Sequence, residues 1–292
     1  KGSSKKDDRN NTFSEFKRTM GHDVKYSSSF TGNEYTSEEL SGFALQELKK
    51  AITDTNVNSA VVTVPNDFDQ TQIDATKKAA ELAGFEYCEL LPEPIAASMA
   101  YQSDNQKLEG TWLVFDLGGG TFDAALVSKK DGIMEVVDTL GDNHLGGKNF
   151  DEEIVDEIVI PHLLEKYEFS NIINDDKKKD ILRNYLKCFA EQTKIRLSDN
   201  ASDIFEPDDE IEDDNGEEVS IELEITRSDY EQIIKKYIDR AIKISNKLLT
   251  NNKLKGDDLL TILPVGGPTF TPYIREQIKT KISDKLDLSI NP

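Results

Sequence analysis

The sequence predicts an α/β fold, and three observations support this prediction. Strand-like and helix-like segments alternate between residues 60 and 103, a pattern typical of parallel strands joined by crossover helices. A glycine-rich hairpin and a later strand that ends in glycines follow in the second half of the chain. A length of 292 residues, of which 37% are hydrophobic, is sufficient to bury a core and to form two lobes.

The alternating segments follow a polar, irregular stretch at 1–35. Apolar residues at helical spacing, opened by Thr36 or Ser37 as the cap, predict the first helix. AVVTVP is a β-branched run that a proline ends, which predicts a buried strand, and Gly84 is a typical residue after the end of a helix. The elements expected in this half are a helix at 37–54, a strand at 60–65, a helix at 69–84, a strand at 85–91 and a helix at 93–103.

The second half opens with the stretch WLVFDLGGGTFD at 112–123. Its apolar run predicts a strand at 112–117, and AALVSKK at 124–130 is expected to be the hairpin partner of that strand. The remaining expected elements are a strand at 133–140, helices at 149–168 and 176–198, two strand-like runs within 201–225, a helix at 228–250, a strand at 259–265 and a helix at 271–284.

The three consecutive glycines of this stretch predict a phosphate-binding turn. Glycine weakens a strand, so three in succession indicate that a ligand comes close to the main chain, where successive N–H groups bind phosphate oxygens. The flanking Asp116 and Asp123 would repel a polyphosphate unless a divalent cation, usually Mg²⁺, lies between them. Thr121 is then a hydroxyl donor to a phosphate, and TILPVGG is a second candidate phosphate loop. The structural alternative is a glycine-rich turn whose acids are simply exposed.

Composition and motifs argue against several classes of ligand and of catalytic site. A net charge of −21 argues against binding to a nucleic-acid backbone or to an anionic membrane. Cys88 and Cys188 have no neighbouring histidine and no CxxC partner, which predicts buried, reduced thiols in a cytoplasmic protein. No GxxxxGK[ST] loop, no GxGxxG before a helix and no GxSxG elbow occurs. The acidic run 206–217 is expected to be a solvated loop, because a calcium loop would need a carboxylate where Ile211 stands.

Several motifs together resemble the nucleotide-binding domain of the seventy-kilodalton heat-shock chaperones of the DnaK type, over about Phe13 to Pro292. The resemblance implies an actin-like, ribonuclease H-like fold of two lobes, with ATP or ADP and Mg²⁺ in the cleft between them. The motifs that carry it are FDLGGGTFD, HLGGKNFD at 144–151, VTVPNDF at 62–68, LPEPIAASMAY at 91–101 and PVGGPT at 264–269.

The same resemblance implies boundaries for the lobes. Residues 1–106 correspond to the remainder of lobe I, and residues 107–292 correspond to lobe II. Within these lobes the expected subdomains are an outer remnant at 1–36, an inner subdomain at 37–106, an inner sheet subdomain at 107–145 and 235–292, and an outer subdomain that contacts adenosine at 146–234.

Roles for single residues are also implied by the resemblance. Lys17 matches the lysine that approaches the γ-phosphate and orients the attacking water, and Glu93 matches a carboxylate that holds hydrated Mg²⁺. The expected catalytic set is Lys17, Glu93, Asp116, Thr121 and Asp123, and the expected Mg²⁺ partners, mainly through water, are Asp116, Glu93 and Asp123.

Nucleotide contacts are expected from glycine turns and from one helix. Glu191, Lys194 and Ser198 are spaced to share a helix face, and the matching residues in the family contact ribose and adenine. The expected nucleotide-binding set is Gly118, Gly119, Gly120, Thr121, Gly146, Gly147 (at the hinge into the next subdomain), Glu191, Lys194, Ser198, Gly266, Gly267 and Phe270.

The chain departs from the family pattern in four ways. No DLGT-type phosphate loop precedes Lys17, and the chain stops at INP, before the family's aspartate that faces Mg²⁺ and before the linker and the peptide-binding domain. The adenosine loop has Pro268, Thr269 and Phe270 in place of Ser-Thr-Arg, so that Phe270 is expected to stack on the base. Glu89 and Pro92 replace an arginine and an asparagine where J-domain cochaperones dock. We therefore expect the isolated 292 residues to bind nucleotide weakly and to be inactive.

The expected function is a Mg²⁺-dependent ATPase switch of a divergent, bacterial heat-shock chaperone in the cytoplasm. Its partners are client peptides, bound through a missing domain, and a J-domain cochaperone and a nucleotide-exchange factor, with no nucleic acid and no membrane. One alternative is a scaffold or cochaperone that binds nucleotide without hydrolysing it, and another is a sugar kinase or filament-forming relative. The joint presence of Lys17, Glu93, Asp116, Thr121 and Asp123 favours hydrolysis.

Overall fold

The computed structural model describes residues 13, 16–52, 57–104, 109–208 and 211–289. Contacts divide the chain into two compact units, 1–96 and 97–292, and the division falls inside helix α3 (Glu93–Asp104). The predicted outer remnant at 1–36 begins outside the described residues. The INP at the C-terminal end also lies outside them. The lobe and subdomain boundaries stay predictions.

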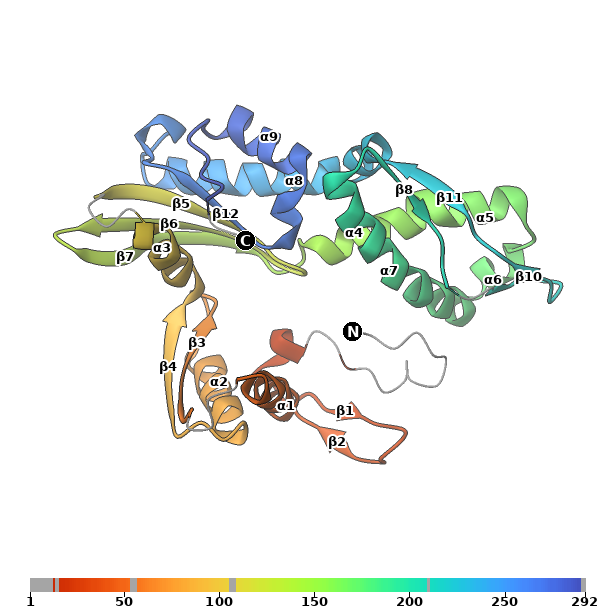
Figure 1. Cartoon of the computed structure of the whole chain (residues 1–292), viewed down its shortest axis with the longest axis horizontal. Coiled ribbons are helices and arrows are strands. Elements are labelled where there is room, and N and C mark those ends of the chain that lie inside the picture. The colour runs from red at the N-terminus through yellow and green to blue at the C-terminus, as the bar shows by residue number, and fades with distance from the viewer. Residues whose placement is uncertain (1–12, 14–15, 53–56, 105–108, 209–210, 290–292) are drawn as a thin grey trace. The chain divides into compact units, whose positions relative to one another are not determined.

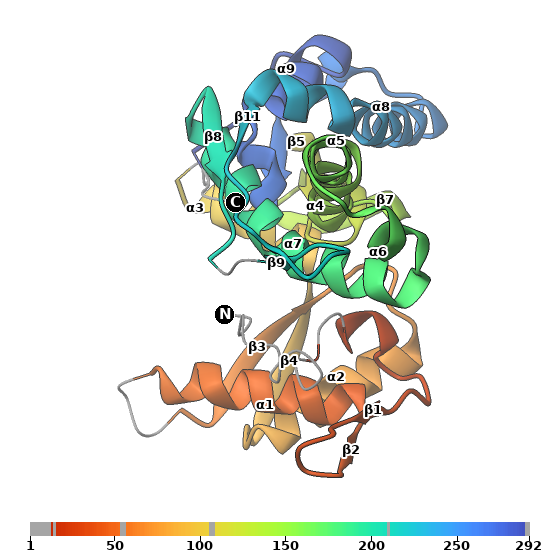
Figure 2. The same ribbon diagram turned by 90° about the vertical axis from the view of Figure 1, so that its right-hand side faces the viewer.

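The first unit contains the predicted alternation of helices and strands. Strands β3 and β4 pair in parallel, with Val64 opposite Pro92, and Figure 2 shows α1 and α2 beside them. Thr36 and Asp69 each cap a helix through a reciprocal capping box, and Gly84 follows α2 with a φ of 81°. The expected irregular N-terminal stretch in fact contains a short helix and a hairpin. The elements are a 3-10 helix (Phe16–Thr19), β1 (Tyr26–Ser27), β2 (Glu34–Tyr35), α1 (Ser37–Lys50), β3 (Ser59–Val64), α2 (Gln70–Leu82) and β4 (Tyr87–Pro92).

A four-stranded sheet forms the centre of the second unit, in the order β12-β5-β6-β7 (Figure 1). The strands are β5 (Gly110–Leu117), β6 (Phe122–Lys130), β7 (Ile133–Asp142) and β12 (Ile262–Val265). The predicted hairpin is confirmed, because β5 and β6 pair antiparallel, and β12 adds to β5 in parallel.

Both faces of β5 are buried, which explains its unbroken apolar run. Leu113, Phe115 and Leu117 belong to the main core on one face, where helix α8 (Arg227–Asn251) contacts the sheet. On the other face Trp112 is fully buried and donates its indole N–H to Ser98 Oγ of α3 at 2.8 Å. Figure 1 shows α8 and α3 on opposite sides of the sheet.

The predicted helix at 149–168 is divided into three parts. A π-helical turn (Ile154–Val159) separates α4 (Gly147–Glu153) from α5 (Ile160–Lys166). The π-helical i→i+5 bond, seen from the N–H of Ile160 to the oxygen of Val155, brings residues five apart onto successive turns. Ile154 and Val159 are five apart and both fully buried, so this geometry keeps both in the core.

The predicted helix at 176–198 is confirmed as α7 (Asp176–Asp199), preceded by α6 (Ser170–Asn174). The described part of the acidic segment is mostly exposed, as expected, and hydrogen bonds also anchor it. Asp214 accepts hydrogen bonds from the N–H groups of Asn171 and Ile172, which ties the loop to α6. The two strand-like runs become four short strands, which pair as β8 (Ser202–Phe205) with β11 (Leu223–Thr226) and as β9 (Ile211–Glu212) with β10 (Glu218–Val219).

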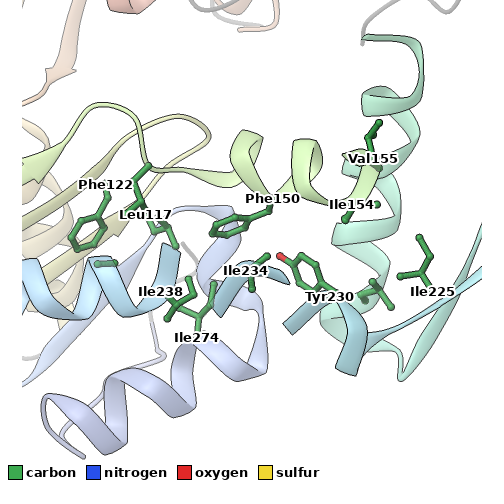
Figure 3. Close-up of a cluster of buried hydrophobic side chains, with 14 of the residues drawn as sticks. Leu117, Phe122, Phe150, Ile154, Val155, Ile225, Tyr230, Ile234, Ile238 and Ile274 are labelled. Carbon is green, nitrogen blue, oxygen red and sulfur yellow. The ribbon is translucent and has the colours of Figure 1, made fainter. Parts of the chain in front are cut away.

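The core of the second unit joins the sheet to the helices around it. Figure 3 shows Phe150 of α4 between Leu117 of the sheet and Tyr230 of α8, and the rings of Phe150 and Tyr230 lie 6.4 Å apart. Ile274 of α9 (Pro272–Lys281) closes the same cluster. This packing holds the end of β5 and the start of α4 against each other.

Two sequence expectations concern the surface. Cys88 is half-buried and Cys188 is exposed on α7, so the prediction of buried thiols is wrong for Cys188. Among the described residues, no helix has the length and apolar character needed to cross a membrane.

Candidate functional site

The glycine turn lies between two aspartates that face each other. Asp116 and Asp123 are cross-strand partners of β5 and β6, and residues 118–121 form the turn beyond them. The N–H of Gly118 donates to the carbonyl of Thr121 at 2.9 Å, which closes the turn. Gly119 is exposed, and a Cβ added there would meet no atom within 4 Å. The main chain is therefore open to a ligand at Gly119.

A second glycine turn packs directly against the first. Gly147 and Lys148 donate their N–H groups to the carbonyl oxygens of Gly118 and Gly119, at 2.9 and 2.7 Å. A Cβ on Gly146 would lie 2.5 Å from the Cα and the nitrogen of Gly120, so a larger residue cannot fit. We call this backbone contact between 118–120 and 146–148 the glycine clamp. It occupies the carbonyl side of the first turn and determines the shape of that turn.

A third glycine turn completes the arrangement. Gly266 follows β12 with φ 92° and ψ 144°, a conformation essentially restricted to glycine, and a Cβ there would overlap the carbonyl oxygen of Leu117. Thr269 Oγ1 donates to the carbonyl of Gly266 at 2.7 Å, and Gly267 is exposed with open space around its Cα. The glycines that sequence reasoning selected in three separate motifs are therefore brought together at one edge of one sheet.

Gly266→Ala is expected to reduce the free energy of unfolding by about 2–5 kcal/mol, because a strained backbone conformation and an overlap with main chain both contribute. Urea unfolding measures this loss. Gly132→Ala is the matched control, since Gly132 also has a positive φ, 79°, but open space around it. Equal losses in the two variants would show that the close approach to Leu117 has no importance.

The first unit holds a separate pair of predicted catalytic residues. Lys17 Nζ lies 2.6 Å from Glu93 Oε1, with side chains that are 59% and 24% exposed. Lys17 belongs to the 3-10 helix, and Glu93 begins α3 directly after β4. Residues distant in the sequence are thus paired within this unit, and solvent reaches both.

On α7, Lys194 does not have the environment of a surface residue. Glu191 is exposed and Ser198 is half-buried, whereas Lys194 is buried. The ammonium of Lys194 lies 2.7 Å from Asp151 Oδ1 and donates to the carbonyl oxygen of Gly147 at 3.2 Å. Burial raises the pKa of Asp151 to about 6, an effect that the charge of Lys194 opposes only in part.

The third turn ends in an exposed aromatic ring. Phe270 is 40% exposed, and the guanidinium of Arg275 lies over its ring, 5.3 Å from the centroid. Arg275 Nε also donates to the carbonyl of Thr269 at 2.7 Å. An arginine of α9 therefore adjoins the third glycine turn, although position 270 itself is aromatic.

Sequence reasoning missed two residues of this region. Gly141 of β7 lies opposite Asp123, and a Cβ at Gly141 would overlap the Asp123 carboxylate, so this glycine makes room for the acid. A glycine inside a strand pattern was the available signal. Asp151 closes the motif HLGGKNFD and is nearly fully buried. Nothing in its spacing from Lys194 showed that the two form a pair.

The donor set near the glycine turn is compatible with a hydrated cation. Like charges directly opposite each other on neighbouring strands destabilise a sheet, and a divalent cation near Asp116 and Asp123 would offset that repulsion. Across the parts of the chain that the structure describes, no group of three or more His, Cys, Asp and Glu side chains forms a direct metal site. The predicted coordination, mainly through water, does not require one.

Comparisons with known proteins agree with one another. The sequence model of the family described as Hsp70 protein matches residues 3–292. The chaperone protein DnaK of Mycoplasmopsis agalactiae is 34% identical over 289 residues, and that of Thermosipho africanus is 35% identical over 285 residues. Each alignment covers 96% of this chain but 46% of the relative, so the chain spans about half the length of these curated relatives. The chain belongs to the Hsp70 family, whose ATPase domain has the actin-like fold.

Proposed function

We propose that this chain is the nucleotide switch of an Hsp70-type chaperone, which binds Mg²⁺-ATP and hydrolyses it. One observation carries the proposal: Asp116 and Asp123 face each other below a glycine turn whose main chain is open at Gly119. An open main chain suits phosphate oxygens, and paired carboxylates suit the cation that accompanies them. The non-hydrolysing scaffold is not favoured, because the family model and both relatives belong to ATP-driven chaperones.

In this proposal the three glycine turns bind the nucleotide. Main-chain N–H groups after Gly118 and the Thr121 hydroxyl are proposed to contact the phosphates, while the glycine clamp holds that turn in shape. The loop of Gly266 and Gly267 approaches the adenosine, with Phe270 stacking on the base. When bound, Mg²⁺ supplies the positive charge that lets a polyphosphate approach two aspartates.

Hydrolysis is assigned to charge and positioning rather than to a covalent intermediate. Asp116, Asp123 and Glu93 would hold the hydrated cation, and Lys17 would place an ammonium at the γ-phosphate to offset developing charge and orient the attacking water. The exposed pair of Lys17 and Glu93 fits this proposal, because the lysine is not buried in a structural ion pair. Glu191, Lys194 and Ser198 are proposed to contact the ribose and adenine, with Gly146 and Gly147 at the hinge.

The relatives are about twice as long as this chain, and further partners are proposed on that basis. Because the chain spans 46% of its relatives, peptide clients, a J-domain cochaperone and a nucleotide-exchange factor are proposed partners of the complete polypeptide. Nucleotide-driven opening and closing is proposed to change peptide affinity in a further domain. A cytoplasmic location is likewise a proposal.

The complete polypeptide that carries this chain is expected to release phosphate from ATP only with Mg²⁺, and EDTA is expected to abolish the release. Asp116→Asn is expected to lower turnover about 100-fold or more, since it removes a charge that holds the hydrated cation. The exposed Asp74, on α2, gives the control variant Asp74→Asn, which is expected to keep full turnover. Nucleotide binding without any phosphate release in the wild type would instead support the scaffold alternative.

A further inference from the structure

A buried ion pair lies directly beneath the glycine clamp. The side chains of Lys194 and Asp151 are 11% and 7% exposed, and their charged atoms lie 2.7 Å apart. Lys194 comes from α7, whereas Asp151 lies on α4, one helical turn after Gly147. The pair therefore connects the long helix to the short helix that begins with the clamp.

The ammonium of Lys194 also contacts the clamp itself. It donates to the carbonyl of Gly147 at 3.2 Å, and a Cβ on Gly147 would lie 3.3 Å from Nζ and 3.0 Å from Pro268 Cγ. The residue whose N–H bonds to Gly118 thus has its carbonyl held by Lys194. Movement of Lys194 would therefore free the carbonyl of Gly147, the residue whose N–H bonds to Gly118.

A buried ion pair of this kind contributes little net stability, because both charges lose their contact with water. Burial raises the pKa of Asp151 from 3.8 to about 6, so the ionised carboxylate is less favourable in the folded protein than in water even with Lys194 beside it. A folded-state pKa above the unfolded value means that this group destabilises the fold above about pH 6 and that the destabilisation disappears as pH falls towards 4. The other groups that face Asp151 are Glu191 and Lys187 of α7 and Tyr230 of α8.

We propose that Lys194 and Asp151 are positioning residues that lock the turn at 146–148 onto the turn at 118–120. The ion pair fixes the ammonium, the ammonium holds the carbonyl of Gly147, and the N–H groups of 147 and 148 hold the carbonyls of the first turn. The buried pair thereby supports the shape of the turn whose main chain is open at Gly119. Its consequence for nucleotide affinity rests on the proposed function, whereas the lock itself does not.

Hydrogen exchange in the nucleotide-free complete polypeptide tests the lock. In the double variant Asp151→Asn/Lys194→Met, the amides of Gly147 and Lys148 are expected to exchange about tenfold faster or more, because their bonded state opens more often. The unfolding midpoint is expected to equal or exceed that of the wild type, since two buried charges are replaced by neutral groups of similar size. Stability of the wild type relative to Asp151→Asn is expected to rise as pH falls from about 6 to about 4.

The matched control is Glu152→Gln/Lys187→Met. Lys187 and Glu152 pair at 2.8 Å and join the same two helices, but their side chains are 28% and 37% exposed. This variant is expected to leave the exchange of the 147 and 148 amides unchanged. Equal exchange in the wild type and in the Asp151→Asn/Lys194→Met variant would overturn the proposal, and so would unfolding of that variant, because the pair would then serve stability.

The affinity for Mg²⁺-ADP separates this inference from the proposed function. Asp151→Asn, which leaves the Lys194 side chain in place, is expected to bind Mg²⁺-ADP about tenfold more weakly or worse, a coupling typical of linked sites. Wild-type affinity in that variant would overturn the proposal. If the wild type itself binds no Mg²⁺-ADP, the proposed function fails, and the exchange of the 147 and 148 amides still decides whether the lock exists.

Discussion

Lys17→Ala is expected to lower the turnover number of the complete polypeptide about 100- to 1,000-fold while nucleotide affinity stays within about threefold, as for loss of one charge-stabilising donor. The ammonium of Lys17 is proposed to act on charge that develops at the γ-phosphate during the reaction, so its loss affects the transition state more than the bound state. Single-turnover phosphate release and a separate binding titration measure the two quantities.

A second lysine of the same unit provides the control for this result. Lys50 forms an exposed ion pair with Glu47 at 2.5 Å on α1, so Lys50→Ala removes a comparable surface charge without touching the proposed site. Exposed pairs contribute only about 0–1 kcal/mol, and neither variant is expected to lower the unfolding midpoint appreciably. Normal turnover in Lys17→Ala would disprove the role proposed for this residue.

Gly119→Ala is expected to weaken Mg²⁺-ATP binding about 100-fold while the free energy of unfolding changes by less than about 1 kcal/mol. An added Cβ at Gly119 meets no atom of the protein within 4 Å, and its φ is not positive, so the fold tolerates the methyl group. The methyl group instead occupies the space in which we propose that a phosphate contacts the main chain. Calorimetric titration and urea unfolding measure the two effects.

Gly146→Ala is the contrasting variant. Its Cβ would lie 2.5 Å from Gly120, so it is expected to lower the free energy of unfolding by about 1–3 kcal/mol through overpacking and to weaken binding as a consequence. We predict that Gly119→Ala loses nucleotide affinity but keeps its stability, whereas Gly146→Ala loses both. If Gly119→Ala binds nucleotide like the wild type, the open main chain has no role in binding.

The order of helices and strands could be predicted because local signals were strong. The apolar run before Gly118 and the capped helices beginning after Thr36 and Asp69 lie where the residue patterns place them. The glycines of 118–120 and 266–267 could be selected because they follow apolar strand runs, whereas Gly146 and Gly147 were selected through the family resemblance. No local signal indicated that the three glycine turns meet at one edge of the sheet.

The remaining features depend on tertiary contacts. The role of Gly141 follows from the β6–β7 register, which sets it opposite Asp123. The pairing of Lys194 with Asp151 depends on how α4 and α7 pack, and a lysine on a helix pattern is ordinarily a surface residue. The π-helical turn at 154–159 likewise depends on packing in the core and not on a local sequence preference.

The most direct test is a structure of the complete polypeptide with Mg²⁺ and a non-hydrolysable ATP analogue. We predict phosphate oxygens in hydrogen-bonding distance of main-chain N–H groups within 118–121, with the cation on the side of Asp116 and Asp123. An analogue bound at another place, or no binding at saturating concentration, would contradict the proposal that these glycines exist to bind a metal-nucleotide.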